Sequence, residues 1–212
     1  SEMVVKASLH GLRIAEVPTT LSPDGRDRPP HLRSWRDGWR HLRFLLLFSP
    51  RWLFLYPGLV LGACGAAGLL ALLPGPLAFG SVTLDVHTML FFAGAVIAGA
   101  QMLTLALCSQ VFAAEHGILP PSALVERFRR LFTFERGLLC GLALLAAGTA
   151  MSVESVLAWD RAHFGAFDPT VGMRIVIPSL TLAMLGLQTF FASLFLGVLD
   201  LRAHERPTAR AR

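Results

Sequence analysis

Four long apolar stretches constrain the fold of this 212-residue chain more than any other feature of its sequence. They cover residues 52–84, 86–114, 137–159 and 175–199. Each is long enough to cross the roughly 30 Å hydrocarbon core of a bilayer as a helix, which takes about 20 residues. Pro74-Gly75-Pro76 should end the first helix, and Pro178 should lie in the first turn of the fourth. With 54% hydrophobic and only 16% charged residues, the composition indicates a membrane protein rather than a soluble domain.

The 19 basic residues, nearly all of them Arg, are distributed unevenly around these stretches. Seventeen lie in residues 1–51, in the middle loop 115–136 and in the tail from Asp200, and only Arg161 and Arg174 lie in the other two loops. Cytoplasmic loops of membrane proteins carry the excess of Arg and Lys. We therefore expect both termini and the middle loop in the cytoplasm, which requires an even number of spans. An arginine excess can also indicate nucleic-acid binding, but the apolar stretches favour a membrane surface, and no nucleic acid is expected as a partner.

Residues 1–21 are typical of a soluble domain rather than of a membrane segment. Residues 1–10 have the pattern of a helix end that stops at Gly11, and residues 12–17 alternate apolar and polar side chains as a strand does, until Pro18 ends it. A single strand cannot form a core without a sheet to pair with. We therefore expect residues 1–21 to be the C-terminal remnant of a domain whose larger part lies upstream of Ser1.

Residues 22–50 combine a basic loop with an amphipathic helix. Pro23-Asp24-Gly25 and Pro29-Pro30 stiffen the loop that carries Arg26 and Arg28. A helix is expected over residues 32–48, with a Trp-bearing face beside a cationic face, as in helices that lie in the plane of the membrane interface. The apolar arc holds Leu32, Trp35, Trp39, Leu42 and Leu46, and the neighbouring arc holds Arg33, Arg36, Arg40 and Arg43. A plain juxtamembrane anchor explains the helix equally well, whereas cations in a rigid loop favour phosphate binding by Arg26 and Arg28.

The order Glu2-Met3, Gly11 and Ile14-x-Glu16-Val17-Pro18, followed by a basic loop, an amphipathic helix and spans, resembles the end of a known enzyme family. It is similar to family 2 glycosyltransferases of the dolichol- or polyprenyl-phosphate mannose or glucose synthase type. The resemblance includes DGRDRPPHLRSWRDGWRHLRFLL and LDVHTML and extends over essentially the whole chain. One departure is the loop after the strand, where mannose synthases usually carry Arg-x-x-Gly-x-Ser-Lys and this chain has SPDGRDRPPHLR.

The resemblance implies an enzyme that moves a sugar from a nucleotide-sugar donor to the phosphate of a polyprenyl (dolichyl or undecaprenyl) lipid at the cytoplasmic face. The family's acidic pair, which holds Mg²⁺ or Mn²⁺, has no Asp-x-Asp counterpart here. The chain alone is therefore expected to carry no catalytic residue, metal or cofactor and to be inactive. The lipid phosphate is expected at Arg26, Arg28 and Arg33. The membrane interface is expected at Trp35, Arg36, Trp39, Arg40 and Arg43.

These inferences predict an all-α integral membrane fold in three parts. Residues 1–21 are the remnant of a GT-A (α/β) catalytic domain, 22–50 the basic loop and interfacial amphipathic helix, and 51–212 four transmembrane helices with a cytoplasmic tail. The expected partners are a polyprenyl phosphate, the membrane and, through the missing domain, a nucleotide sugar, and a homo-oligomer is left open. The expected location is the bacterial inner membrane. The alternative is a non-enzymatic four-span glycolipid carrier, flippase subunit or membrane scaffold, which would have no use for the helix–strand remnant.

Other polar and small residues in the apolar stretches have weaker functional interpretations. Charged groups near the non-cytoplasmic span ends should be solvated there: Asp85, His87 and Glu154. Gln101 and Gln188 fall in mid-span and could form hydrogen bonds between helices. Close helix packing is expected at Gly58-xxx-Gly62 and Gly137-xxx-Gly141. The cysteines are interpreted as small apolar residues without metal-binding spacing: Cys64, Cys108 and Cys140.

Overall fold

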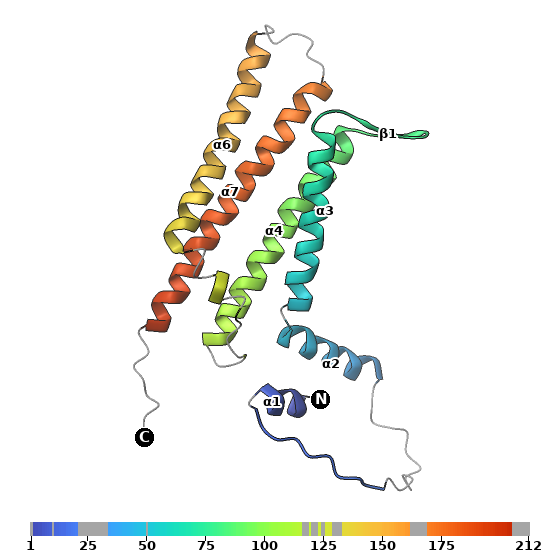
Figure 1. Ribbon diagram of the computed structural model, residues 1–212, viewed down its shortest axis with the longest axis vertical. Coiled ribbons are helices and arrows are strands. Elements are labelled where there is room, and N and C mark those ends of the chain that lie inside the picture. The colour runs from blue at the N-terminus through green and yellow to red at the C-terminus, as the bar shows by residue number, and fades with distance from the viewer. Residues whose placement is uncertain are drawn as a thin grey trace.

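The computed structural model describes residues 2–9, 11–20, 34–49, 51–115, 119, 123, 126–128, 133–161 and 169–204. Within these residues the protein is mostly helical (Figure 1). The two helices before the membrane-like part are α1 (Glu2–Leu9) and α2 (Ser34–Phe48). The long helices are α3 (Tyr56–Leu72), preceded by the π-helical segment η1 (Arg51–Leu55), α4 (Val86–Glu115), α6 (Phe134–Arg161) and α7 (Pro169–His204). A two-stranded hairpin of β1 (Leu77–Phe79) and β2 (Val82–Leu84) joins α3 to α4.

Four helical segments are long and apolar enough to cross a membrane. They are Arg51–Leu72, Val86–Ala114, Phe134–Arg161 and Thr170–Leu199. They coincide with the four apolar stretches, and the predicted fold of four membrane helices preceded by an amphipathic helix is confirmed. The second matches the prediction at both ends, while the third and fourth extend further through charged residues at their ends.

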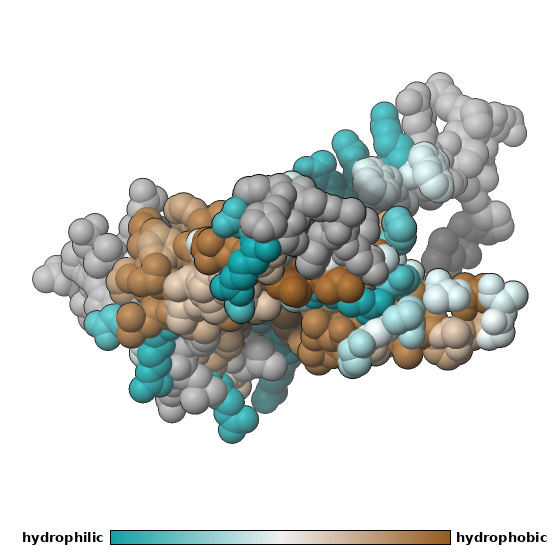
Figure 2. Space-filling model, turned by 90° about the horizontal axis from the view of Figure 1, so that it is seen from above, coloured by the Kyte–Doolittle hydropathy of each residue, from teal (hydrophilic) through white to brown (hydrophobic). Residues whose placement is uncertain are grey.

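The four helices lie side by side in the order α3, α4, α7, α6, as Figure 1 shows. The α3–α4 and α6–α7 pairs are antiparallel helical hairpins, and α4 packs on α7 to join them. We call this arrangement the helix layer, its end beside β1 and β2 the hairpin end, and its opposite end the α2 end. Only 11–17% of the most apolar part of each span is buried inside the protein. Figure 2 shows apolar surface over the helices as seen from the hairpin end. Lipid is as apolar as these side chains, so no hydrophobic force pulls the helices into a closed bundle.

Glycines allow the two helices of each pair to approach closely. A Cβ atom at Gly99 of α4 would lie 2.5 Å from the backbone nitrogen of Gly62 in α3. A Cβ at Gly141 of α6 would lie 2.6 Å from the backbone nitrogen of Phe190 in α7. The predicted close packing at Gly58-xxx-Gly62 and around Gly141 is therefore confirmed, because neither contact leaves room for a side chain.

The expectation that Pro178 lies in the first turn of its helix is wrong. Helix α7 begins at Pro169, so Pro178 is inside it. The prediction started the span after Arg174 because a charged residue normally marks the end of a membrane helix. Here the helix continues through Arg174, whose charge is paired with Asp85, the residue just before α4. Beside Pro178, the Ser152 hydroxyl of α6 donates a hydrogen bond to the Ser179 hydroxyl of α7 at 3.0 Å.

The first residues confirm one local prediction and contradict another. Helix α1 is followed by a turn at Gly11, whose φ is +66°, with hydrogen bonds from Gly11 N to Ser8 O (3.1 Å) and from Leu12 N to Ala7 O (2.9 Å). This pair of bonds is the glycine-terminated helix end that the sequence indicates. The predicted strand over residues 12–17 is wrong for this chain, because residues 12–20 have no regular secondary structure and stay exposed. A strand exists only when a neighbouring strand accepts and donates its backbone hydrogen bonds.

Candidate functional site

Helix α2 lies just beyond the end of α3 and runs sideways, away from α4, α7 and α6 (Figure 1). Its described part, Ser34–Phe48, confirms the predicted amphipathic helix. Trp35 is 89% and Trp39 58% exposed, so neither indole is buried against the rest of the protein. The neighbouring face carries the exposed side chains of Arg36, Arg40 and Arg43. An apolar face and a cationic face that are both uncovered suit a helix whose surroundings are part lipid and part water.

The basic loop that precedes α2 contains the three predicted phosphate ligands. Arg26, Arg28 and Arg33 lie outside the described residues. Their role in binding a lipid phosphate therefore stays a prediction, as does the interfacial role of Trp35, Arg36, Trp39, Arg40 and Arg43.

A cavity of about 260 Å³ lies between α4 and α7 in the half of the helix layer nearer the α2 end. Apolar side chains from both helices form most of its wall, together with one aromatic ring from the middle loop. The lining residues are Ala100, Leu103, Thr104, Leu107, Phe128, Thr189, Ala192, Ser193 and Leu196. A partly open, mainly apolar hollow between membrane helices is suited to a hydrocarbon chain.

The three hydroxyls of the cavity wall are occupied by their own helices. Thr104 Oγ1 donates to Ala100 O at 3.0 Å, Thr189 Oγ1 to Leu185 O at 2.7 Å and Ser193 Oγ to Thr189 O at 2.8 Å. Each of these hydroxyl protons is already donated to a carbonyl oxygen of its own helix. An apolar ligand in the cavity would therefore leave none of these three hydroxyl donors without a hydrogen bond. Sequence reasoning missed this cavity. One weak signal in the sequence was the pair Thr189 and Ser193, one helical turn apart in the fourth apolar stretch.

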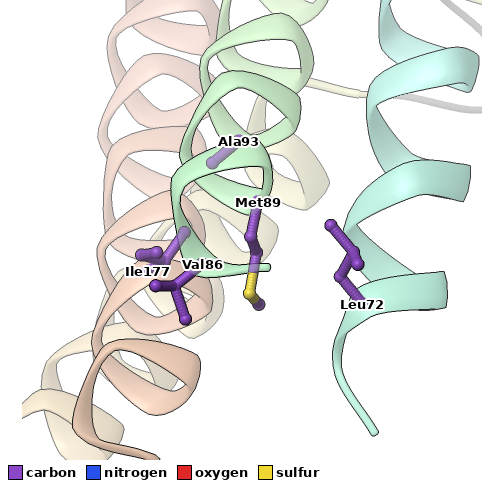
Figure 3. Close-up of a cluster of buried hydrophobic side chains, with 5 residues drawn as sticks. All are labelled: Leu72, Val86, Met89, Ala93 and Ile177. Carbon is purple, nitrogen blue, oxygen red and sulfur yellow. The ribbon is translucent and has the colours of Figure 1, made fainter. Parts of the chain in front are cut away.

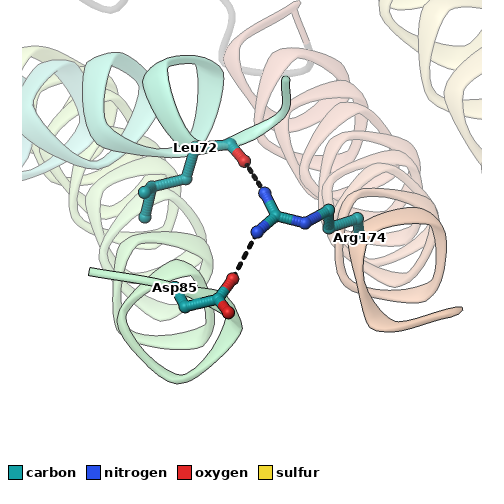
Figure 4. Close-up of polar contacts among 3 residues, drawn as sticks. All are labelled: Leu72, Asp85 and Arg174. Atoms are coloured by element: carbon teal, nitrogen blue, oxygen red, sulfur yellow. Dashed lines mark hydrogen bonds and ion pairs between the residues drawn. The ribbon is translucent and has the colours of Figure 1, made fainter. Parts of the chain in front are cut away.

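The same two helices are held together at the hairpin end by a polar contact (Figure 4). The Arg174 guanidinium of α7 donates one hydrogen bond to the carbonyl oxygen of Leu72, at the end of α3, and pairs with the Asp85 carboxylate just before α4. The side chains of Arg174 and Asp85 are only 15% and 31% exposed. Arg174 thus satisfies a C-terminal helix carbonyl and a carboxylate at once, and ties α7 to both helices of the α3–α4 pair.

An apolar cluster fills the space beside this contact. Leu72, Met89 and Ala93 pack with Val86 and Ile177, so that all three helices contribute to it (Figure 3). Leu72 and Met89 are almost completely buried, at 1% and 0% exposure. The α4–α7 contact is therefore closed at the hairpin end and hollow towards the α2 end.

The remaining polar residues of the spans differ in their exposure and in their hydrogen-bond partners. His87 and Glu154 are exposed, as predicted, but Asp85 is paired rather than simply solvated. Gln101 lies on the exposed surface, and the Oε1 atom of Gln188 is buried with no hydrogen-bond partner among the described residues. The predicted interhelical hydrogen bond is therefore not made by that oxygen.

Within the described ranges, no group of three or more His, Cys, Asp and Glu side chains could hold a metal ion. Cys64 and Cys140 are exposed and Cys108 is half-buried, and all three are free thiols. The expectation that Mg²⁺ or Mn²⁺ is held by a separate catalytic domain stays a prediction.

Comparison with known proteins identifies the class to which this membrane region is similar. Residues 107–200, from the second half of α4 to the end of the fourth span, match the C-terminal transmembrane region of family 2 glycosyltransferases. This part of the chain is thus similar to the membrane region of that family, in agreement with the resemblance noted in the sequence.

One relative is a characterised type of sugar transferase. Over 203 residues the chain is 30% identical to the low-salt glycan biosynthesis hexosyltransferase Agl6 of Haloferax volcanii. The alignment covers 94% of this chain but 46% of that protein, so the chain spans about half the length of the relative it matches. No solved structure matches the chain.

Proposed function

We propose that this chain is the membrane module of a glycosyltransferase that moves a sugar from a nucleotide-sugar donor to a polyprenyl phosphate. Its own part in the reaction is to hold the lipid acceptor at the cytoplasmic membrane surface. The similarity to a family 2 membrane region and to a hexosyltransferase supports the enzyme class. The observation that carries the acceptor assignment is the apolar cavity between α4 and α7, which lies towards the same end of the helix layer as the Arg- and Trp-bearing helix α2.

A polyprenyl phosphate has two parts that need different surroundings. Its phosphate is a dianion or close to one at neutral pH, and it requires cations at headgroup depth. Its chain is pure hydrocarbon and requires apolar surface. Helix α2 with its preceding loop supplies the cations, and the cavity between α4 and α7 supplies apolar room on the membrane side of them.

The distribution of basic residues supports the orientation that this function needs. The α2 end receives residues 1–51, the middle loop and the tail, with 17 of the 19 basic residues, and the hairpin end receives only Arg161 and Arg174. The positive-inside rule therefore favours a cytoplasmic α2 end, in a bacterial inner membrane or its equivalent. A soluble nucleotide sugar would then meet the phosphate on the correct side.

The chemistry assigned to this chain is binding and orientation. Guanidinium groups of Arg26, Arg28 and Arg33 hold the phosphate oxygen that attacks the sugar, which lowers the entropic cost of bringing two substrates together. Donor binding, Mg²⁺ or Mn²⁺ and the catalytic acids belong to the GT-A domain of the whole enzyme. Under this proposal the remnant 1–21 connects that domain to the membrane module.

Comparing the binding of three lipids distinguishes this function from generic anchoring in the membrane. The chain is reconstituted in nanodiscs of phosphatidylcholine, and bound lipid is counted by native mass spectrometry. Polyprenyl phosphate is compared with phosphatidate, which has the same phosphomonoester head but acyl chains, and with polyprenol, which has the same chain but no phosphate. We expect clear preference for polyprenyl phosphate over both. Equal binding of phosphatidate would leave only an anionic-lipid anchor, and equal binding of polyprenol would remove the arginines from the site.

A further inference from the structure

The β1–β2 hairpin presents one apolar face and one more polar face. Its register pairs Leu77 with Leu84, Ala78 with Thr83 and Phe79 with Val82. Because side chains alternate along a strand, the first and third pairs share a face, and the middle pair lies on the opposite one. The turn at Gly80-Ser81 is tight, with Gly80 at φ +60°, so this pattern is held up to the tip.

Only half of the apolar face is covered by protein. At the base, Leu77 and Leu84 are partly buried against the cluster formed by Leu72, Val86 and Met89. At the tip, Phe79 is 65% and Val82 56% exposed. Figure 1 shows the hairpin pointing sideways from the end of α3, away from the other helices. The apolar face therefore begins in the protein core and continues outwards beyond the edge of the helix layer.

The depth of the hairpin follows from the segments that it joins. The span that includes α3 ends at Leu72 and the next span begins at Val86, so both strands lie where the chain leaves and re-enters the hydrocarbon region. Asp85, which pairs with Arg174, directly follows β2 in the chain. No residue from 73 to 84 is charged. Aromatic and apolar side chains at this depth are typical of the membrane interface.

From this geometry we propose that the hairpin is a lateral membrane anchor. Its apolar tip, Phe79 and Val82, rests on the acyl chains of the leaflet at the hairpin end, and Ala78 and Thr83 face the aqueous side. The base of the same face packs against residues inside the span, so the tip must turn towards the hydrocarbon and not towards water. A free two-stranded hairpin is only marginally stable in water, and contact with lipid supplies the apolar surface that its tip lacks.

The anchor does not depend on the lipid acceptor or on the direction of insertion. It fixes the turn between α3 and α4 at the membrane surface and opposes tilting of the α3 edge of the helix layer. It is therefore a property of the fold that could be present even if the proposed sugar transfer were disproved.

Spin labels on the two faces test this anchor directly. Single cysteines replace Phe79 or Thr83, with Ala78→Cys as a second position on the aqueous face, in the full chain with Cys64→Ala, Cys108→Ala and Cys140→Ala. Each protein is labelled with a nitroxide and reconstituted in phosphatidylcholine–phosphatidylglycerol vesicles. Collision rates with oxygen, which concentrates in lipid, are compared with those of a water-soluble nickel chelate.

The two faces should give opposite results. At position 79 we expect the ratio of collisions to shift towards oxygen, and at positions 83 and 78 towards nickel. Equal nickel access on both faces would place the hairpin in water and overturn the anchor. Low access of both reagents at position 79 would show that protein covers the tip, as in contact with a second copy of the chain, and would also overturn it.

Discussion

Ala192 controls the room available in the cavity between α4 and α7. Its small side chain leaves part of the wall open, together with Ala100 on the facing helix. Ala192→Phe should fill this space and weaken binding of polyprenyl phosphate roughly tenfold, because a guest would then have to displace a packed ring. The dissociation constant is measured by titration in nanodiscs.

Ala143→Phe is the matched control for this substitution. It makes the same change on the exposed surface of α6, close in the chain to Gly141, which contacts Phe190 of α7. Its affinity should equal that of the unchanged chain. If Ala192→Phe also leaves the affinity unchanged, while polyprenyl phosphate still binds in preference to phosphatidate, the acceptor chain lies elsewhere and the cavity has no part in binding.

Arg26 and Arg28 are the residues on which the phosphate assignment depends. Replacing both with Ala should raise the concentration of polyprenyl phosphate needed for half-saturation, by about tenfold or more, and leave polyprenol binding unchanged, since only the charged head loses its partners. In the intact enzyme, binding of the sugar donor should stay nearly the same. The double substitution Arg202→Ala and Arg206→Ala removes two charges from the tail and serves as the control. Equal effects of the two pairs would reduce the role of the loop to net charge.

At the scale of the elements, the contact among Arg174, Asp85 and Leu72 joins the two helical hairpins. Asp85→Asn should lower the thermal stability of the reconstituted chain, because the half-buried guanidinium of Arg174 would lose its counter-charge, at a cost of about 1–3 kcal/mol. Glu154→Gln removes an acid from the exposed surface of α6 and should change little. Unfolding is followed by circular dichroism. Identical melting curves for the two variants would show that the ion pair contributes nothing to stability.

Gly99 and Gly94 of α4 make a second matched pair. A side chain at Gly99 would meet the backbone of Gly62, whereas a Cβ at Gly94 would meet nothing within 4 Å. Gly99→Leu should therefore force α3 and α4 apart and cost roughly 1–3 kcal/mol, while Gly94→Leu should be tolerated. Thermal unfolding in the same detergent decides between them, and equal loss of stability in both variants would mean that the close contact of Gly99 with Gly62 does not control the outcome.

Elements whose signals are local were predictable from sequence. Helix α2 follows from its two-faced periodicity, and the end of α1 follows from Gly11. The start of α7 was not predictable, because a helix that continues through Arg174 depends on Asp85, far away in the chain. The β1–β2 hairpin was also missed, since strands of three residues are too short to show a period. For residues 12–17 the opposite happened: the sequence pattern predicted a strand, but the described residues include no partner strand for it and no strand forms there.

For the whole molecule, the uneven distribution of Arg and Lys predicts how the protein is oriented in the membrane. A cysteine at Ser34, at the start of α2, should react with a membrane-impermeant thiol reagent only after cells are permeabilised. A cysteine at Ser81, in the turn between β1 and β2, should react in cells with an intact inner membrane. The reversed pattern would place α2 outside and exclude a soluble cytoplasmic sugar donor for this site.

Sequence patterns alone were sufficient to predict four membrane-length helices, an amphipathic helix before them and the uneven distribution of basic residues. These properties depend on length, hydropathy and periodicity, which are local and need no knowledge of neighbours. Four features became visible only in the folded chain: the order α3, α4, α7, α6, the pairing of Arg174 with Asp85, the direction of the β1–β2 hairpin and the cavity between α4 and α7. Each of these depends on which side chains from distant parts of the chain fit against one another, and that fit is a property of packing in three dimensions.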